Sequence, residues 1–213
     1  MEKLITSSLL SGIEFLRDCP PSWKGSAFQS LKATLSRTYK EPTRQIKRGI
    51  DFEDSIYKTL STMDSVDFKN YSAEYQQFLN DCCGGVFQKT TKKIIEIEGT
   101  KYLLYGKIDV WFPGLIIDIK TTENFTGDEK YLKTSQHEIY CFCENIPTFL
   151  YKVAVFEGEG NKIKEVKNIF YFCADFSALE IKIKERIKQD LLYLQAFPDL
   201  FYFYENVYCQ GKK

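Results

Sequence analysis

The spacing of apolar residues changes along the chain. Helical periodicity governs roughly the first third and is interrupted at Cys19-Pro20-Pro21. Between Val86 and Lys120 the pattern changes to short runs rich in β-branched and aromatic residues, with turn signals at Glu98-Gly99 and Pro113-Gly114. Runs of this kind separated by turn residues predict an antiparallel meander of strands.

The remaining pattern predicts helices and strands in alternation. We expect helices within 1–19 and at 43–60, 73–79, 127–143, 177–196 and 197–208, and strands at 86–98, 101–112, 115–120, 148–157 and 162–174. Ser177 with Glu180 three residues later has the form of a capping box at the start of a helix. The order predicts one α/β domain, 1–213, with a central mixed sheet flanked by helices: a helical N-terminal segment (1–45), a core (46–175) and C-terminal helices (176–213).

Composition fits this architecture. The 213 residues are 44% hydrophobic and 15% aromatic, as in an ordinary globular protein. No uninterrupted apolar run approaches the roughly 18 residues that a membrane span requires. The N-terminal segment carries Glu14, Arg17 and Asp18 and has no small-residue cleavage pattern, so we expect a helix there, no signal peptide and a cytoplasmic protein.

Cysteine and histidine content argues against two kinds of site. The chain has seven cysteines, no C-x-x-C pair and one histidine, His137. Zinc sites and disulfide frameworks need paired spacings that are missing here, so we expect reduced, buried thiols.

Charge is informative only locally. Lys plus Arg equals Asp plus Glu, at 29 each, which gives no sign of a nucleic-acid partner. The segment 22–48, however, has one acid, Glu41, against a run of bases: Lys24, Lys32, Arg37, Lys40, Arg44, Lys47 and Arg48. Such a run forms either a solvated face or a phosphate-binding face, and the sequence leaves both open.

The most informative stretch is G-K-I-D-V-W-F-P-G-L-I-I-D-I-K, residues 106–120. Because side chains alternate along a strand, Asp118 and Lys120 share one face. If Pro113-Gly114 forms a two-residue hairpin loop, Asp109 lies opposite Asp118, and two opposed carboxylates are unfavourable unless a divalent cation lies between them. The alternatives are a register shifted by one residue, since Pro-Gly is not the favoured tight turn, and a solvent-facing sheet surface.

The helix predicted at 43–60 carries a second candidate. Ile46, Ile50, Glu53, Tyr57 and Leu60 recur at spacings of 4, 3, 4 and 3, so they share one face. We expect this face to pack on the sheet, with Gly49 allowing a close approach, and a buried carboxylate there needs compensation such as a metal. The alternative is a glutamate at the edge of the stripe that reaches solvent.

These motifs together resemble a known family. G-x-x-x-E, G-x-I-D, I-I-D-I-K-T-T and Q-x-x-x-Y, in this order, resemble the RecB-type and lambda-exonuclease-like branch of the PD-(D/E)xK nucleases, which has a restriction-endonuclease-like core. The matching pairs are Gly49/Glu53, Gly106/Asp109, Asp118/Lys120 and Gln136/Tyr140. The segment L-S-G-I-E-F-L-R-D-C-P (10–20) is also similar to the helix ending in Cys-Pro that opens several RecB-type domains.

The resemblance implies roles for named residues. Glu53, Asp109, Asp118 and the backbone carbonyl of Ile119 would bind Mg²⁺ or Mn²⁺, with Glu53 acting directly or through water. Lys120 would position or deprotonate the attacking water and stabilise the phosphate. Gln136 and Tyr140 would brace the site and touch the cleaved strand. Residues assigned to nucleic-acid contact are Lys107, Thr121, Arg44, Lys47, Arg48, Gln136 and Tyr140.

The resemblance also has departures and alternatives. Ile108 stands where the family name implies proline, and only Cys173 and Cys209 lie near the C-terminus, so no iron–sulfur cluster is expected and Cys19 would ligate nothing. The implied activity is metal-dependent hydrolysis of DNA, as an exonuclease of phage recombination type. DNA is then the partner, and a recombination or annealing protein a second one. A non-catalytic nucleic-acid-binding protein and an unrelated α/β protein are the alternatives; strand preference, polarity and oligomeric state stay open.

Overall fold

The computed structural model describes residues 2–38, 41–62, 71–158 and 162–211. Within this part, a mixed sheet of six strands has the order β1-β3-β4-β5-β6, and β2 pairs with β3 outside this path. The strands are β1 (Lys3–Thr6), β2 (Val86–Ile97), β3 (Thr100–Phe112), β4 (Leu115–Thr122), β5 (Thr148–Phe156) and β6 (Ile163–Phe172). The fold is therefore the predicted mixed sheet flanked by helices, with the predicted meander β2-β3-β4 antiparallel.

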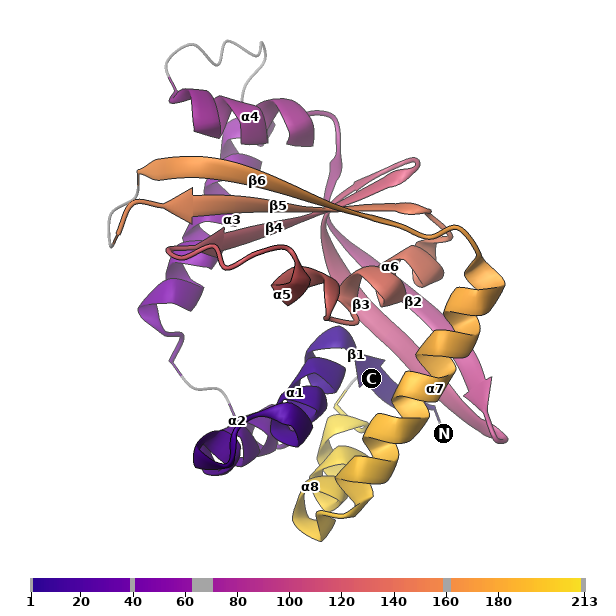
Figure 1. Ribbon diagram of the computed structural model, residues 1–213. Coiled ribbons are helices and arrows are strands. Elements are labelled where there is room, and N and C mark those ends of the chain that lie inside the picture. The colour runs from indigo at the N-terminus through magenta and orange to yellow at the C-terminus, as the bar shows by residue number, and fades with distance from the viewer. Residues whose placement is uncertain (1, 39–40, 63–70, 159–161, 212–213) are drawn as a thin grey trace.

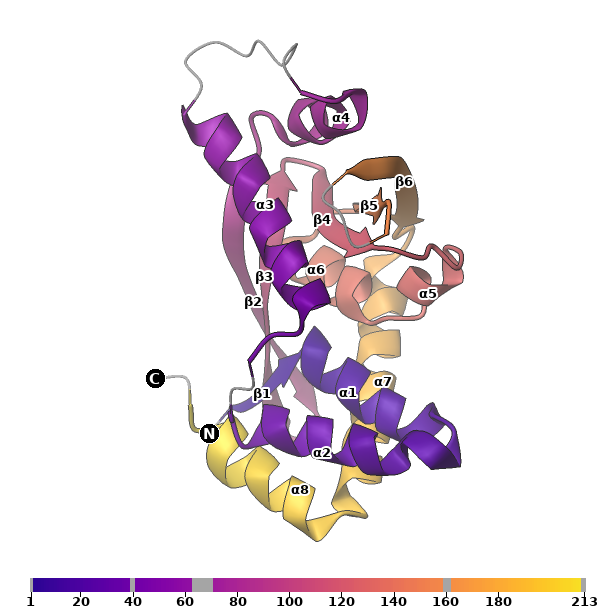
Figure 2. The ribbon, with the colours of Figure 1, turned by 90° about the vertical axis from the view of Figure 1, so that its left-hand side faces the viewer.

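Helices cover both faces of the sheet (Figure 1). The helices are α1 (Ser7–Asp18), α2 (Lys24–Leu35), α3 (Arg44–Thr62), α4 (Ala73–Cys82), α5 (Glu129–Leu132), α6 (Gln136–Glu144), α7 (Phe176–Gln195) and α8 (Pro198–Phe203), the last continued by a π-helical turn at Tyr204–Tyr208. Figure 2 shows α3 and α4 on one side of the strands, and α1, α2, α7 and α8 gathered at the other end of the molecule.

Two apolar cores lie on opposite faces of the sheet. The face under α3 and α4, called the α4 face, buries Phe52, Ile56 and Phe78 against Ile117 and Leu150. The other face, called the α6 face, is packed by α1, α6 and α7, and its core includes residues from both ends of the chain: Leu9, Ile13, Ile116, Ile139, Phe149, Ile187 and Leu194. Because β4 contributes to both cores, it is a central strand, as its apolar opening residues predict.

The first residues form a strand rather than the predicted helix. β1 pairs in parallel with β3, where Leu4 and Ile5 become buried, and α1 begins only at Ser7. This pairing joins segments about a hundred residues apart, so local periodicity gives no sign of it. Two parts of the prediction lie outside the described residues. They are Lys40 and, apart from Gly158, the expected turn across Gly158–Asn161.

Two helix boundaries also differ from the prediction. The continuous helix expected at 127–143 is two helices, α5 and α6, separated at Lys133–Ser135. The start of α7 is capped by Asp175, whose carboxylate accepts hydrogen bonds from the backbone of Ser177 and Ala178 at 2.8 and 3.1 Å. The expected cap, Ser177, is already inside the helix, because an aspartate two residues earlier satisfies the same free N–H groups.

The buried face of α3 is not the predicted stripe. Ile46, Ile50 and Tyr57 are about half exposed, at 56%, 50% and 48%, whereas Phe52 and Ile56 are buried in the core. At 100° per residue, the buried face is rotated by roughly a quarter turn from the predicted one. Glu53 lies at the boundary between the buried and the exposed faces and is half-buried. The expectation that Ile46, Ile50 and Tyr57 pack in the core is therefore wrong.

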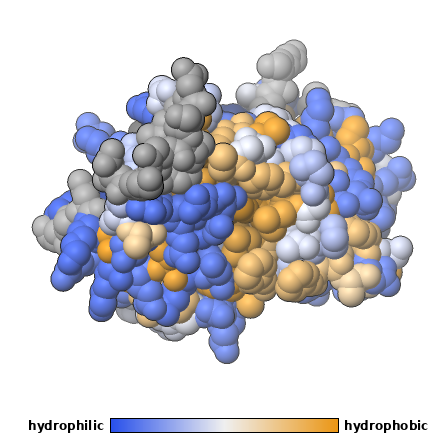
Figure 3. All heavy atoms as spheres, turned by 90° about the horizontal axis from the view of Figure 1, so that it is seen from above, coloured by the Kyte–Doolittle hydropathy of each residue, from blue (hydrophilic) through white to orange (hydrophobic). Residues whose placement is uncertain are grey.

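The α4 face is covered only in part. Figure 3 shows apolar atoms exposed across the upper side of the molecule, bordered by polar ones. Phe170 and Phe172 of the edge strand β6 are 50% and 67% exposed, with their rings stacked 6.0 Å apart.

Among the described helices, none combines the length and the apolar composition that a membrane span requires.

Candidate active site

The site forms where β3 and β4 separate. Their ladder pairs Phe112 with Leu115 and ends at Val110 with Ile117, which makes Asp109 and Asp118 the next pair in sequence. This is the register that a two-residue Pro-Gly loop predicts, and the one-residue shift is excluded. Beyond this point Asp109 no longer follows the ladder: its Oδ2 accepts a hydrogen bond from the backbone N–H of Ile119 at 2.8 Å. The strands diverge with both carboxylates at the fork.

At the fork, part of the β3 edge that pairs with β1 and β4 is not paired with either strand. β1 pairs with β3 at Tyr102–Tyr105 and β4 pairs with it at Val110–Phe112, so none of the described strands pairs with 106–109 on that side. α6 fills the gap. The ring of Tyr140 lies against Gly106, and its hydroxyl donates a hydrogen bond to the carbonyl of Lys107 at 3.1 Å. Tyr140 therefore supplies a polar contact where the sheet supplies none.

Asp118 is the most enclosed member of the site. Its residue is 1% exposed, its Oδ2 lies 2.6 Å from Lys120 Nζ, and its Oδ1 accepts a hydrogen bond from Gln136 Nε2 at 2.5 Å. The Lys120 side chain is 36% exposed, although its ammonium is paired with a buried carboxylate. Asp118 and Lys120 share a face, as strand alternation predicts, and Gln136 joins them from α6.

Electrostatics in the fork favour a bound cation. Burial, and after it the charges of Asp118 and Glu53, raise the pKa of Asp109 well above its usual range. The pKa of Glu53 is also raised, by burial and by Asp118. Burial alone would lower the pKa of Lys120, but the charges of Asp118 and Asp109 outweigh it and the pKa is raised. Three carboxylates thus repel one another around one ammonium, and additional positive charge would stabilise the cluster.

Glu53 is held by a residue that sequence patterns did not indicate. Its carboxylate accepts a hydrogen bond from the side-chain amide of Gln88. Gln88 lies in β2 opposite Asp109, where the β2-β3 ladder is interrupted between the Phe87 and Lys89 pairs. Its φ of 54° is in the left-handed region, which costs a residue with a Cβ about 1 kcal/mol or more. A backbone distortion is therefore built into the strand beside the carboxylates.

Two glycines of the motifs permit close approach. A Cβ on Gly49 of α3 would lie 3.2 Å from Thr121 Oγ1 of β4, so the helix crosses the strand with little room, as the sequence predicts. A Cβ on Gly106 would lie 2.2 Å from Cε1 of Tyr140. These contacts hold α3 and α6 against the strands that carry Asp109 and Asp118.

Comparison with known proteins identifies the architecture. Neither a protein-family model nor a curated protein matches the chain. Among solved structures, a phage-related exonuclease from Haemophilus somnus 129PT matches with a TM-score of 0.51 at 14% identity, over 91% of this chain and 94% of that one. The protein SSO0001 matches with a TM-score of 0.51 at 13% identity, over 90% of this chain and 76% of that one.

The chain shares its fold with these two structures, one of which is a phage-related exonuclease. At these identities the likeness concerns the arrangement of strands and helices, and the chemistry must be argued from this chain's own side chains. In this fold, the fork of β3 and β4 with α3 and α6 packed beside it holds Glu53, Asp109, Asp118, Lys120 and Gln136 together.

The predicted nucleic-acid contacts divide into two groups. Lys107 is exposed on β3 two residues before Asp109, and Thr121 follows Lys120 on β4, with its hydroxyl against Gly49 of α3. Arg44, Lys47 and Arg48 lie elsewhere: they line a cavity on another side of α3. Gln136 and Tyr140 contact the site as braces, and Tyr140 is only 5% exposed.

The donor set suits a hard divalent cation, although its members do not converge. Within the described ranges, no group of three or more His, Cys, Asp or Glu side chains is arranged to hold a metal ion. Two contacts account for this: Glu53 is turned to Gln88, and Lys120 is paired with Asp118. Asp118 Oδ2 is buried with the Lys120 ammonium 2.6 Å away, and within the described residues no donor meets it in hydrogen-bond geometry. Carboxylate and carbonyl oxygens are the ligands that Mg²⁺ and Mn²⁺ prefer, so the residues fit such a cation.

Proposed function

We propose that this chain is a nuclease that hydrolyses phosphodiester bonds of DNA with Mg²⁺ or Mn²⁺, acting as an exonuclease of phage recombination type. The observation that carries the proposal is the fork itself: Lys120 ion-paired to the buried Asp118, with Asp109 one strand away. The exonuclease preference is supported by the Gln136-x-x-x-Tyr140 helix and by the fold shared with a phage-related exonuclease.

Asp109 and Asp118 are proposed to hold the cation, with the carbonyl of Ile119 and with Glu53 directly or through water. When bound, the cation makes a water molecule more acidic and offsets charge on the phosphate. The Ile119 N–H that binds Asp109 fixes the direction of that carboxylate. Since burial raises the pKa of Asp109, a bound cation would favour the charged form of this carboxylate.

Lys120 is proposed to be the catalytic residue that touches the substrate. Its side chain extends from the buried Asp118 to the surface, where its Nζ can donate a hydrogen bond to a phosphate oxygen and orient the attacking water. Gln136 is proposed as a positioning residue, because its amide binds the Asp118 oxygen that does not face Lys120. Tyr140 supports the bare edge of β3 and so positions Lys107 and Asp109.

Digestion of DNA by purified variants tests the proposal. We expect Lys120→Ala and Asp118→Asn to lose Mg²⁺-dependent degradation of end-labelled linear DNA by a factor of a hundred or more, with unfolding transitions that remain cooperative. Lys133→Ala is the matched control: its side chain is 77% exposed and lies outside the fork, so activity should be unchanged. Wild-type activity in both Lys120→Ala and Asp118→Asn would refute the assignment.

Two further measurements separate the parts of the proposal. Mn²⁺ should raise the melting temperature of the wild type but not of Asp118→Asn, because a ligand stabilises only a fold that holds its site. Closed circular DNA should resist digestion that consumes linear DNA. If the circle is cut as fast as the linear form, the enzyme is an endonuclease. If DNA is bound but not cut, the protein is the non-catalytic alternative.

A further inference from the structure

A cavity of about 620 Å³ lies beside α3, and Glu53 is not among the α3 residues that line it. Arg44, Lys47, Arg48, Asp51 and Ser55 recur along α3 at helical spacing and line one wall. The other walls come from the segment leading into α4, the end of β5 and the start of β6. α3 therefore separates two sites, with the carboxylate fork on one side and this cavity on another. Its volume is in the range that small-molecule sites have.

Most of the charged residues that line the cavity are basic. Arg44, Lys47, Arg48 and Lys162 line it, against one acid, Asp51. Arg48 and Lys162 have carboxylate partners, Glu123 at 3.0 Å and Glu157 at 2.8 Å. The ammonium of Lys47 has no such ion pair among the described residues, and its side chain is exposed. A phosphate at this wall would pair with the Lys47 ammonium.

Arg48 is the fixed part of the wall. Its side chain is only 10% exposed, its guanidinium lies 4.7 Å from the centre of the Phe156 ring, and it donates to the carbonyl of Gly158 at 3.2 Å. Its Nε is nevertheless buried and has no hydrogen-bond partner among the residues that the structure describes. A buried guanidinium N–H with no acceptor is unfavourable, so an acceptor supplied by a ligand would stabilise it.

Aromatic rings line the side toward α4. Tyr71 and Tyr75 lie with ring centres 5.1 Å apart, and Phe52 and Phe156 meet edge to face at 5.5 Å. The hydroxyl of Tyr75 is already bonded to Ser55 at 2.9 Å, which fixes that ring as part of the wall. Rings beside cations are the combination that accepts a nucleobase together with its phosphate.

We propose that this cavity binds a nucleoside monophosphate unit, with the phosphate at Lys47 and the Arg48 wall and the base against Tyr71 and Tyr75. The unit can come from a free mononucleotide or from one nucleotide of a single strand, since both present the same chemistry. The proposal needs no cation and no hydrolysis. It therefore stands or falls separately from the nuclease assignment.

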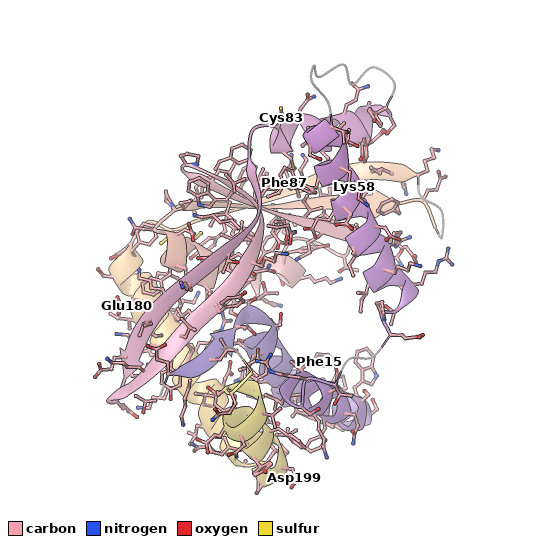
Figure 4. All side chains as sticks on the ribbon, turned by 180° about the vertical axis from the view of Figure 1, so that it is seen from behind. Phe15, Lys58, Cys83, Phe87, Glu180 and Asp199 are labelled. Carbon is pink, nitrogen blue, oxygen red and sulfur yellow. The ribbon has the colours of Figure 1, made fainter. Side chains whose placement is uncertain are left out.

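Calorimetric titration of the full chain with thymidine 5′-monophosphate in EDTA tests it. We expect saturable binding that Lys47→Glu weakens by tenfold or more and that Asp118→Asn changes by less than twofold. Lys58→Glu is the matched control, because this exposed lysine is on the same helix and does not line the cavity (Figure 4). It should also change binding by less than twofold.

The two halves of the cavity have separate readouts. Thymidine and inorganic phosphate should each bind at least tenfold more weakly than the monophosphate. Tyr71→Leu should weaken the monophosphate but not inorganic phosphate. An oligothymidylate that binds more tightly than the monophosphate, with the same loss in Lys47→Glu, identifies a strand as the natural ligand; equal affinity identifies the free nucleotide.

Two results would overturn the proposal. One is the lack of saturable binding of both the monophosphate and the oligonucleotide by the wild type. The other is binding that Asp118→Asn abolishes and Lys47→Glu retains, because the ligand would then occupy the carboxylate fork.

Discussion

Replacing Gly106 by alanine tests the contact between α6 and the bare edge of β3. The added Cβ would lie 2.2 Å from Tyr140 Cε1, against at least 3.4 Å in an ordinary contact, so the ring or the strand must shift by about 1.2 Å. The Gly106 φ is not in the left-handed region, so the backbone itself accepts alanine. The cost is therefore one of overpacking, which is about 1–3 kcal/mol.

Thermal and urea unfolding measure this cost. For a chain of this size, about 1–3 kcal/mol corresponds to a fall in melting temperature of about 2–12 °C. A shift of Tyr140 also moves Gln136, one helical turn earlier, away from Asp118. Degradation of linear DNA by Gly106→Ala should therefore be slower than by the wild type even at temperatures where both are folded.

A double-mutant cycle isolates the contact. The three atoms nearest to the added Cβ are Cε1, Cζ and the hydroxyl of Tyr140, and leucine has none of them. Gly106→Ala should therefore cost less than about 0.5 kcal/mol in a Tyr140→Leu background. Gly25→Ala, in α2 with no atom within 4 Å, is the matched control and should stabilise by up to about 1 kcal/mol. Equal destabilisation by Gly106→Ala in both backgrounds would refute the reasoning.

Three further predictions concern His137, Gln88 and Asp81. Burial lowers the pKa of His137 to about 4, below the usual 6.5, so the unfolded chain binds the proton first. The contribution of His137 to stability should therefore fall by about 3 kcal/mol between pH 6.5 and 4, and the difference in stability between the wild type and His137→Gln in a pH series of urea melts should change by that amount. Gln88→Gly should stabilise the fold by about 0.5–1 kcal/mol, because glycine adopts the φ of 54° without the strain of a Cβ. The same variant should cleave DNA more slowly, because it loses the hydrogen bond to Glu53. Unchanged cleavage would contradict a role for this contact. Asp81→Ala should destabilise the fold by up to about 3 kcal/mol, because the fully buried Lys152 loses its carboxylate partner and keeps only the side chain of Asn168. Lys152→Met should restore most of that loss in denaturant melts. A loss that persists in the double variant would show that the ion pair is not the cause.

The sequence by itself determined the local geometry of β3 and β4. A two-residue loop at Pro113-Gly114 fixes which residues face each other, so the pairing of Phe112 with Leu115 and the approach of Asp109 to Asp118 could be counted from the turn. Strand alternation likewise placed Asp118 and Lys120 together. These features depend on neighbours in sequence, which is where patterns are reliable.

The orientation of α3 was beyond the sequence. Its residues fit a helix, but two apolar sets lie on it, and only packing against the sheet decides that Phe52 and Ile56 are buried while Ile46 and Tyr57 are exposed. This rotation turns Arg44, Lys47 and Arg48 into the wall of a cavity, away from the carboxylate fork. An amphipathic pattern gives the period of a helix, and the choice among its faces depends on the surface it meets.

Long-range contacts decided the rest. β1, at the start of the chain, pairs with β3 about a hundred residues later. Gln88 takes a left-handed conformation opposite Asp109, and glutamine is not a residue that predicts a turn. Gly106 is tolerated in a strand because the ring of Tyr140 occupies the space of its missing side chain. The sequence thus specified which chemical groups are present and how near neighbours are ordered. The tertiary structure decided which distant groups meet, because packing of the whole chain fixes those contacts.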